Sequence, residues 1–538
     1  MNKIFTLLTL ILLFSLGAKS QEQTPNQNLP YSYSFYQKLN KQVYDKDSRM
    51  HSSIKNYFLD DTLINARYTE LMNFGVDSLR NRSWVRRKIT DEHLINFTSP
   101  DFTIYADFLP DMQIGREFND NQQTWRNTRG FQIGGTVGKK FSFYTNAYEN
   151  QAVFANYLTK FINENQVVPS EMSSTKLDGT TKDWQYATAN ISYTPNKFLN
   201  LTLGYDKNFI GDGYRSMLLS DVAANYSFVR MRATLGNVVY QSIFSYMLDN
   251  GAPRLTDDRR LGARAKWNAM HYLDWNITKR LSLGFFQAVT WADAEPEGKR
   301  GFDFNYVHPF VFLRPVEGAN GLSPDKMRLG FNAKYELLEK TTLYSQFMFD
   351  EFTVKEVFGG KGYWANKYAF QLGVRGSDLF KVNNLNYLLE YNMATPYTYA
   401  HYARITSYSN QSQPLADPLG ANFREFIGLL NYSYKRFDFQ GQLMYAIYGL
   451  DPEGLNYGKN ILLNYNTHVQ DYGNKIGQGL KTNLYYGEVK ASYLLNPKYN
   501  LRIELGGVYR RENNGIPSNT GLVTIGLRSA FRNLYQDF

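Results

Sequence analysis

The chain has 538 residues, no cysteine and a formal net charge of +10. The lack of cysteine excludes disulfides and metal–thiolate sites, and the small positive excess favours an anionic partner without indicating nucleic acid. Aromatic residues make up 16% of the chain although its mean hydropathy is −0.46. This combination is typical of a membrane β-barrel, whose tyrosines and phenylalanines lie at the two interfaces while the lumen stays polar. A large secreted β-sandwich or propeller is the alternative class.

The first twenty residues have the pattern of a secretory signal peptide. Lys3 precedes an apolar run over 4–17, and Ala18 and Ser20 supply the small residues of a cleavage site before Gln21. The apolar run is too short for a helix that spans a membrane. We therefore expect export from the cytoplasm, and no lipoprotein, because no cysteine follows the run.

Residues 21–100 do not alternate between apolar and polar. The spacing over 61–75 is helix-like and ends at Gly75. We expect a small, partly helical, water-exposed N-terminal region on the periplasmic side.

Alternation begins after residue 100 and recurs in segments along the chain up to Arg532, after which it slips phase. Residues 186–193 and 199–205 form the clearest pair, two period-two arms around a turn at 194–197. One opening strand, eight such hairpins and one closing strand make about eighteen, an even number as single-chain barrels require. The prediction is an all-β protein, with a transmembrane antiparallel β-barrel of about eighteen strands over residues 101–538.

Short turns alternate with long connections along this barrel. The short turns lie near residues 139, 195, 279, 435 and 497, and the long connections cover about 149–183, 206–227, 292–328, 351–367, 394–422 and 449–482. Short turns of such barrels face the periplasm and long loops face outward. We expect the outer membrane of a Gram-negative bacterium, contact with its lipid, and both chain ends in the periplasm. The terminal Phe538, with Tyr535 before it, resembles the aromatic ending that barrels present to their insertion machinery.

The predicted inner face carries several cations and two nearby carboxylates. These residues are Arg230, Arg232, Arg264, Lys266, Arg502, Arg510, Arg528 and Arg532, with Glu488 and Glu504. They predict either an electropositive interior for anions or an arginine–carboxylate lattice that neutralises itself.

The six histidines give little support for an enzyme. Only His271 lies on a clearly predicted strand, where it shares the apolar face with Trp267 and Trp275, as a membrane-interface residue would. His308 and His401 lie in long loops, and no two histidines have the spacing of metal ligands. We expect no catalytic site, no metal and no cofactor.

Two loops hold the candidate ligand-binding residues, and a third, 449–482, also suits carbohydrate because it contains Tyr457, Tyr465, Tyr472 and several asparagines. In 394–422 they are Tyr397, Tyr402 and Arg404, since aromatic faces between polar groups suit sugar rings; interface tyrosines with ordinary loop polarity are the alternative. In the glycine-bearing segment 206–221 they are Asp206, Asp212, Tyr214 and Arg215. If this segment folds inward it plugs the lumen and pairs with the wall, whereas if it points outward these residues are exposed to ligand.

The segment Gly204 to Asp221 and the strands over 228–247 resemble the signature of the capsule-assembly Wzi family. The segments 273–289 and 305–310 fit the same pattern. The chain is also similar in length and order to the RemB type of gliding-motility outer-membrane protein. The Wzi resemblance implies an eighteen-stranded barrel with a periplasmic helical bundle, acting as a non-enzymatic lectin for capsular polysaccharide. The outer loops show no alignable match, so no sugar-contacting residue is carried over.

Three functions are therefore open. The first is a barrel that binds or organises surface polysaccharide. The second is a structural part of a surface-motility or secretion assembly, with protein partners at its loops or its N-terminal region. The third is an anion-selective pore.

Overall fold

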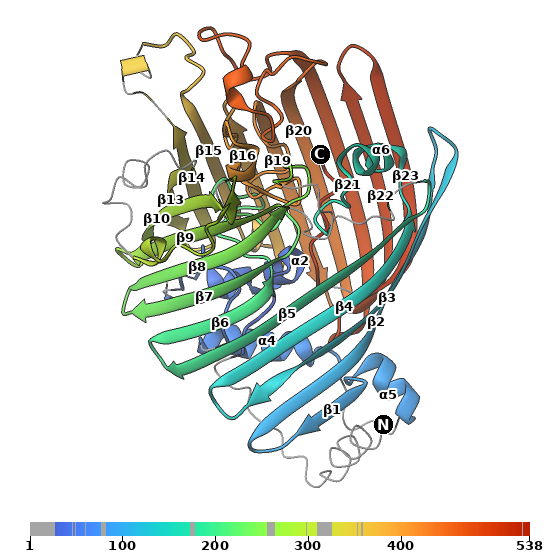
Figure 1. Ribbon diagram of the computed structural model, residues 1–538. Helices are drawn as coiled ribbons and strands as arrows, with labels where there is room; N and C mark the ends of the chain where they lie inside the picture. The colour runs from blue at the N-terminus through green and yellow to red at the C-terminus, as the bar shows by residue number, and fades with distance from the viewer. Residues whose placement is uncertain are drawn as a thin grey trace.

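The computed structural model describes residues 27–45, 47–48, 50–59, 61–76, 82–172, 177, 179–255, 264–296, 298–308, 325–351, 353, 355–356, 359–529 and 531–538. Within them, nineteen strands form one sheet, and eighteen of these close on themselves as an antiparallel barrel because β2 pairs with β23. This confirms the predicted fold class (Figure 1). The predicted signal peptide, residues 1–20, lies outside the described residues.

The wall follows chain order. Its strands are β2 (Phe102–Glu117), β3 (Gln122–Val137), β4 (Phe141–Val153), β5 (Lys182–Asn196), β6 (Leu199–Asp206), β7 (Tyr226–Leu235), β8 (Val238–Asp249), β9 (Arg264–Asn276), β10 (Leu281–Ala292), β13 (Lys326–Leu338), β14 (Thr341–Glu351), β15 (Lys367–Gly376), β16 (Leu385–Ala394), β19 (Phe423–Tyr434), β20 (Phe437–Leu450), β21 (Leu480–Asn496), β22 (Leu501–Asn513) and β23 (Pro517–Ser529). The nineteenth strand, β1 (Ile95–Thr98), pairs with β2 beyond the end of β23. Two-residue strands make the small hairpins β11 (Ala294–Glu295) with β12 (Gly298–Lys299) and β17 (Ser409–Asn410) with β18 (Gln413–Pro414).

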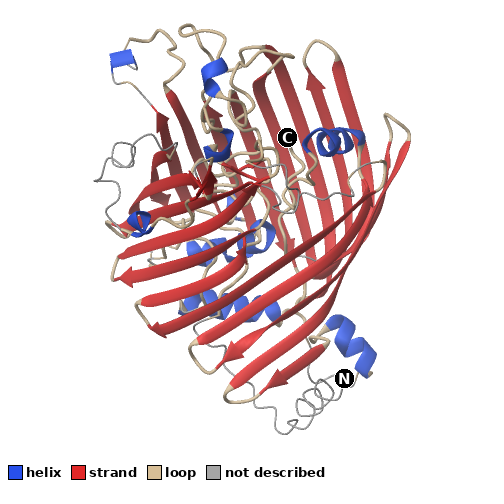
Figure 2. Ribbon diagram, viewed as in Figure 1, coloured by secondary structure: helices blue, strands red, loops and turns tan. Residues whose placement is uncertain are grey.

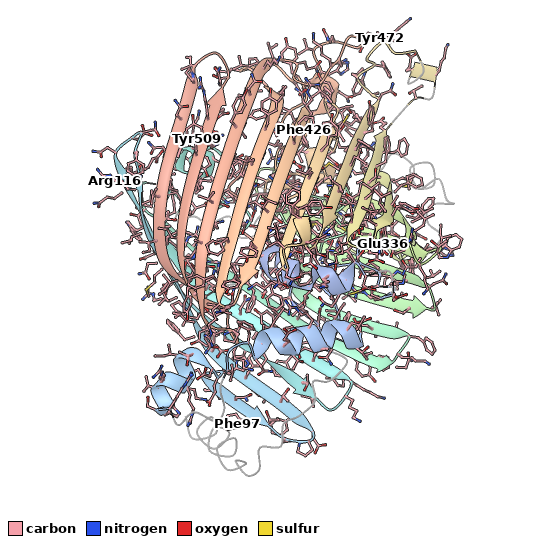
Figure 3. The ribbon with its side chains drawn as sticks, turned by 180° about the vertical axis from the view of Figure 1, so that it is seen from behind. Phe97, Arg116, Glu336, Phe426, Tyr472 and Tyr509 are labelled. Atoms are coloured by element: carbon pink, nitrogen blue, oxygen red, sulfur yellow. The ribbon has the colours of Figure 1, made fainter. Side chains whose placement is uncertain are left out.

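Alternation along each strand gives the wall an apolar outside and a polar inside. On β2, for example, Phe108 and Ile114 are exposed whereas Asp107 and Asp111 are buried. Figure 3 shows Phe426 and Tyr509 on the outer wall. An apolar surface facing outward and a polar one facing inward is the reverse of a water-soluble barrel, and it is the pattern of strands that contact lipid.

Helices are short and lie inside the barrel or at its ends (Figure 2). They are α2 (Tyr33–Tyr36), η1 (Gln37–Leu39), α3 (Asn40–Val43), α4 (Thr62–Met72), α5 (Trp84–Thr90), α6 (Asn156–Asn165), η3 (Phe304–Val307), η5 (Leu379–Lys381), η6 (Arg404–Thr406) and η7 (Tyr465–Thr467). None of the helices found in the described ranges has the length and apolar content needed to cross a bilayer.

The N-terminal segment, residues 27–59, enters the end of the barrel where the short turns lie. Leu39, Val43 and Ile54 are buried, and Lys38 forms an ion pair with Asp438 on β20 at 2.7 Å. The expectation that this region is water-exposed is therefore wrong for this segment. Leu39 and Val43 pack in a small core with Ile64 of α4, whereas Ile54 joins the large core inside the barrel.

Two loops also fold into the lumen. We call residues 207–225 the plug segment and residues 395–422 the inner loop. Met217 and Leu218 of the plug segment are fully buried, and their carbonyl oxygens accept hydrogen bonds from Tyr399 Oη at 2.7 Å and Tyr408 Oη at 2.6 Å of the inner loop. Of the two conformations predicted for 206–221, the inward one is therefore confirmed.

The last eight residues form a third lumenal element. Strand β23 ends at Ser529, and the tail, residues 531–538, turns into the barrel, where Phe538 packs on Phe161 of α6 with ring centroids 4.7 Å apart. Figure 1 shows the C-terminus within the barrel outline. The aromatic ending therefore lies outside the closing strand.

Candidate functional site

Polar and aromatic side chains gather in two places, the lumen and the long-loop end. In the lumen the centre is Arg215, which is fully buried on the plug segment. Its guanidinium lies 3.0 Å from Asp537 of the tail, 3.5 Å from Glu425 on β19 and 3.8 Å from Asp417 of the inner loop. One cation therefore joins the plug segment, the wall, the inner loop and the tail.

A carboxylate on the wall holds the turn before Arg215. The backbone N–H groups of Tyr214 and Arg215 donate to Glu390 of β16 at 2.9 and 3.1 Å. The backbone at Gly213 approaches so closely that an added Cβ would lie 2.2 Å from Glu390 Oε2. Glycine is needed here for close approach, and not as part of a phosphate-binding loop.

Asp212 joins the plug segment to the N-terminal segment. Its carboxylate accepts hydrogen bonds from Ser52 Oγ at 2.7 Å and Tyr44 Oη at 2.9 Å, and Arg375 of β15 donates to its backbone oxygen. Burial raises the pKa of Asp212, but Lys55 and the other nearby cations outweigh burial and hold that pKa below its ordinary value. Asp212 is thus a charged link between two lumenal elements.

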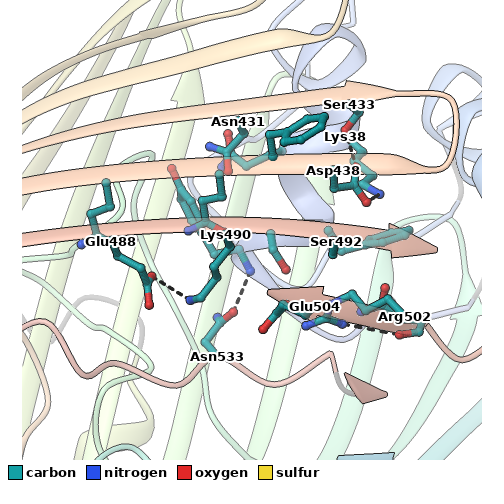
Figure 4. Close-up of a pocket in the computed structure, with 18 of the residues that line it drawn as sticks. Lys38, Asn431, Ser433, Asp438, Glu488, Lys490, Ser492, Arg502, Glu504 and Asn533 are labelled. Carbon is teal, nitrogen blue, oxygen red and sulfur yellow. Dashed lines mark hydrogen bonds and ion pairs between the residues drawn. The ribbon is translucent and has the colours of Figure 1, made fainter. Parts of the chain in front are cut away.

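On one side of the inner wall the arginines pair with carboxylates, as the lattice interpretation predicts, whereas Arg230 donates to Asn208 and Lys266 to the carbonyl of Ser407. Arg528 pairs with Glu504 at 2.9 Å and with Asp111, and Arg532 pairs with Glu171 at 2.6 Å. A cavity of about 170 Å³ lies between β19–β23, the N-terminal segment and the tail. Figure 4 shows that its charges are also paired, as Lys490 with Glu488 and Arg502 with Glu504.

The other predicted site residues also face the interior, except one. Asp206 accepts from Asn190 Nδ2 at 2.7 Å, and Arg404 pairs with Asp249 of β8 at 3.2 Å. Tyr397 is buried and donates to the carbonyl of Asn456 at 2.9 Å, whereas Tyr402 is 41% exposed. Of the seven residues predicted, Tyr402 alone presents a large exposed surface at the long-loop end.

At that end, aromatic rings from three loops form a continuous row. We define the aromatic row as Tyr472, Tyr363, Trp364, Tyr465 and Tyr402. Neighbouring ring centroids lie 5.3, 6.2, 5.3 and 6.2 Å apart in that order. Tyr472 at one end is 48% exposed, and Figure 3 shows it at the tip of the loops.

Polar groups border the aromatic row. His468 stacks on Trp364 with ring centroids 4.1 Å apart, and its Nε2 lies 2.7 Å from the exposed carboxylate of Asp471. Lys367 Nζ lies 3.6 Å from the ring centroid of Tyr465 and pairs with Glu351. Flat apolar faces beside hydroxyl, imidazole and carboxylate groups match the alternating CH and OH surfaces of a sugar ring.

Two of the six histidines, His271 and His401, are buried among other side chains. Burial, followed by the charges of Lys326 and Arg328, lowers the pKa of His401 to about 2, so it stays neutral and is a poor base. His271 does not face the membrane interface as predicted, because η3 covers it and the carbonyl of Tyr306 lies 2.9 Å from its Nε2. Across the described ranges, no group of three His, Asp or Glu residues is placed to hold a metal ion.

Sequence reasoning missed Tyr363, Trp364 and His468. The signal available was Gly-Tyr-Trp at 362–364 in a predicted long loop. This signal could not identify the aromatic row by itself, because the partner residues Tyr465, His468 and Tyr472 belong to another loop, residues 451–479, far along the chain.

Comparison with known proteins supports the architecture. Wzi, an outer-membrane protein involved in group 1 capsule assembly in Escherichia coli and described as a carbohydrate-binding β-barrel, superposes with a TM-score of 0.56 at 13% identity, over 94% of this chain and 100% of that chain. The fold is that of an outer-membrane β-barrel. OprD of Pseudomonas aeruginosa gives a TM-score of 0.42 at 10% identity, over 82% of this chain and 97% of that chain. No protein-family model and no curated protein matches the sequence.

Proposed function

We propose that the protein is a non-enzymatic outer-membrane barrel that binds surface polysaccharide at its long-loop end, facing the cell exterior. The observation that carries the proposal is the aromatic row, which three separate loops assemble with exposed rings at both ends. The exposed rings of Tyr472 and Tyr402 offer stacking faces to sugars of an extended chain, the buried Tyr465 supports the row from below, and the polar border offers hydrogen bonds to hydroxyls.

The filled lumen favours this function over an anion pore. The N-terminal segment, plug segment, inner loop and tail occupy the interior, and Arg215, Arg528 and Arg532 are paired with carboxylates there. The barrel then serves as a rigid frame for the loops, since sites on a rigid scaffold are better preorganised. The fold shared with Wzi, a protein described as carbohydrate-binding, agrees with the proposal.

The test is direct binding of polysaccharide extracted from the surface of the producing cells to the full chain in nanodiscs. We expect Tyr472→Ala and Tyr402→Ala each to weaken binding about tenfold, because each removes one stacking face. Tyr434→Ala is the matched control, since Tyr434 is also exposed but lies beside a short turn at the other end.

Two results would contradict the proposal. Equal binding by all variants would place the glycan elsewhere on the molecule. No binding by the unaltered chain, together with loss of surface spreading in a deletion strain whose polysaccharide stays attached, would indicate a structural role in a motility assembly.

A further inference from the structure

Helix α5 exposes its apolar half. Trp84 is 59%, Val85 56% and Ile89 47% exposed, on a helix of seven residues. Val85 and Ile89 are one turn apart on one side of the helix, and Trp84 lies about 100° from Val85 around the axis, with Lys88 between them. Arg86 borders this side next to Ile89, Arg87 lies opposite, and both arginines are exposed. An amphipathic helix with a bare apolar side is stable when a matching surface covers that side.

The helix has a fixed position on the barrel. Asn496 Nδ2 donates to the carbonyl oxygens of Lys88 at 3.0 Å and Glu92 at 2.9 Å, and Tyr499 Oη donates to that of Lys88 at 3.1 Å. These bonds attach the last turn of α5 to the turn between β21 and β22. Figure 1 shows α5 beside β1 and β2, at the end of the barrel with the short turns.

The apolar surface of the wall continues across β1 towards this helix. Ile95 pairs with Ala106 and Phe97 pairs with Ile104, residues that share a strand face with the exposed Phe108 of β2. Ile95 and its neighbour Leu94 are exposed as well. Figure 3 shows Phe97 at the opposite end of the barrel from Tyr472. The outer face of β1 therefore extends the lipid-facing wall, and only residues 91–94 separate this strand from α5.

The charge of this segment matches anionic headgroups. Residues 82–92 contain four basic residues (Arg82, Arg86, Arg87, Lys88) and two acidic ones (Asp91, Glu92), a net charge of +2. Arg82, Arg87 and Lys88 pair with these acids. The side chain of Arg86 is exposed and forms no ion pair with another described residue, which leaves it available to a phosphate.

We propose that α5 is an interfacial anchor that lies in the headgroup layer at the short-turn end and binds anionic phospholipid. Trp84, Val85 and Ile89 insert among the acyl chains, and Arg86 contacts phosphate. This anchor holds the connection between the N-terminal segment and β1 against the membrane surface, independently of any function at the loops. The barrel thereby gains a second membrane contact beyond its strands.

The test uses the lack of native cysteine. Nitroxide labels are placed one at a time on Val85→Cys, Ile89→Cys and Arg86→Cys in the full chain, reconstituted in vesicles of phosphatidylcholine with phosphatidylglycerol. Accessibility to oxygen, which enriches in lipid, is compared with accessibility to a water-soluble nickel chelate. Leu505→Cys on the exposed outer wall is the lipid reference, and Lys139→Cys in a short turn at the same end is the water reference.

We expect the labels at 85 and 89 to resemble the label at 505, and the label at 86 to resemble the label at 139. Labels at 85 and 89 that are as accessible to nickel as the label at 139 would overturn the proposal and point to a water-facing or protein-binding helix. The two apolar positions are independent, so a failure of one variant to fold leaves the other as the test.

Lipid charge is tested separately. In phosphatidylcholine alone we expect the ratio of oxygen to nickel accessibility at position 85 to fall at least about twofold, because each basic residue near an anionic surface adds to its attraction. Introducing Arg86→Glu into the labelled Val85→Cys variant is expected to abolish the difference in this accessibility ratio between the two lipid compositions. Equal ratios in both lipids without that substitution would overturn the anionic preference.

Discussion

The plug segment and the outer loops have similar tyrosine, asparagine and charged residues but opposite surroundings. In the plug segment, Tyr214 and Arg215 are buried, and both contact Asp537. Tyr214 donates a hydrogen bond to its carboxylate, and Arg215 forms an ion pair with it. In the outer loops, Tyr472 is half exposed and Asp471 faces solvent. Residue type alone therefore does not identify a binding site, because the same side chains serve as internal links in one place and as a surface in the other.

The largest expected effect comes from removing the central cation of the plug segment. Arg215→Leu leaves Asp417, Glu425 and Asp537 without their shared partner, and such a loss of one member of a buried ion pair costs about 3–5 kcal/mol. We expect a lower urea midpoint and increased conductance in planar bilayers. Arg215→Lys keeps the charge, so its free energy of unfolding should fall less. Unchanged stability and conductance in Arg215→Leu would show that the plug segment is held by other contacts.

Lys55, which is buried in the lumen, should make the free energy of unfolding depend on pH. Burial lowers the pKa of Lys55 from its ordinary value of 10.5 to about 7. Between pH 7 and 9 the unfolded chain therefore binds more protons at Lys55 than the folded chain, so the free energy of unfolding should rise with pH by about 2 kcal/mol. We expect Lys55→Met to remove this rise in urea unfolding curves, whereas Lys279→Met, at an exposed turn, should retain it. An identical pH slope in Lys55→Met would contradict the assignment.

A smaller effect is expected from the tail. Asp537→Asn removes its ion pair with Arg215, but Glu425 and Asp417 still face that cation, so the loss should be about 1–2 kcal/mol. Because the same pair is broken, the effects of Asp537→Asn and Arg215→Leu should not add in the double variant. Additive losses measured by urea unfolding would mean that the tail and the plug segment are held independently.

The smallest effect on stability is expected in the aromatic row. Tyr472→Ala removes an exposed ring, so the free energy of unfolding should change by less than about 0.5 kcal/mol while glycan binding falls. Urea unfolding and polysaccharide binding on the same preparation check both parts. A large loss of stability would make Tyr472 a structural residue and remove the contrast with the lumen.

The candidate sites were predicted less well than the wall. The glycines of 206–221 and the tyrosines of 394–422 marked these segments as special, but both segments fold inward. Phe209, Ile210, Met217 and Leu218 are apolar without a strand period, a pattern more consistent with packing in the lumen than with exposure in a loop. The expected ligand role of Asp212, Tyr214 and Arg215 remains a prediction, whereas their contacts show a structural one.

The sequence by itself determined the barrel, its strand number and the direction in which side chains face. These properties depend on local alternation, because a one-residue shift of register would turn every apolar side chain into the lumen. Only the tertiary structure decided what fills the barrel and which aromatic residues meet outside it. Arg215 and Asp537 are more than 300 residues apart and form an ion pair at 3.0 Å, and Trp364 meets Tyr465 across separate loops. Such contacts depend on closure of the whole wall, which no local pattern of residues records.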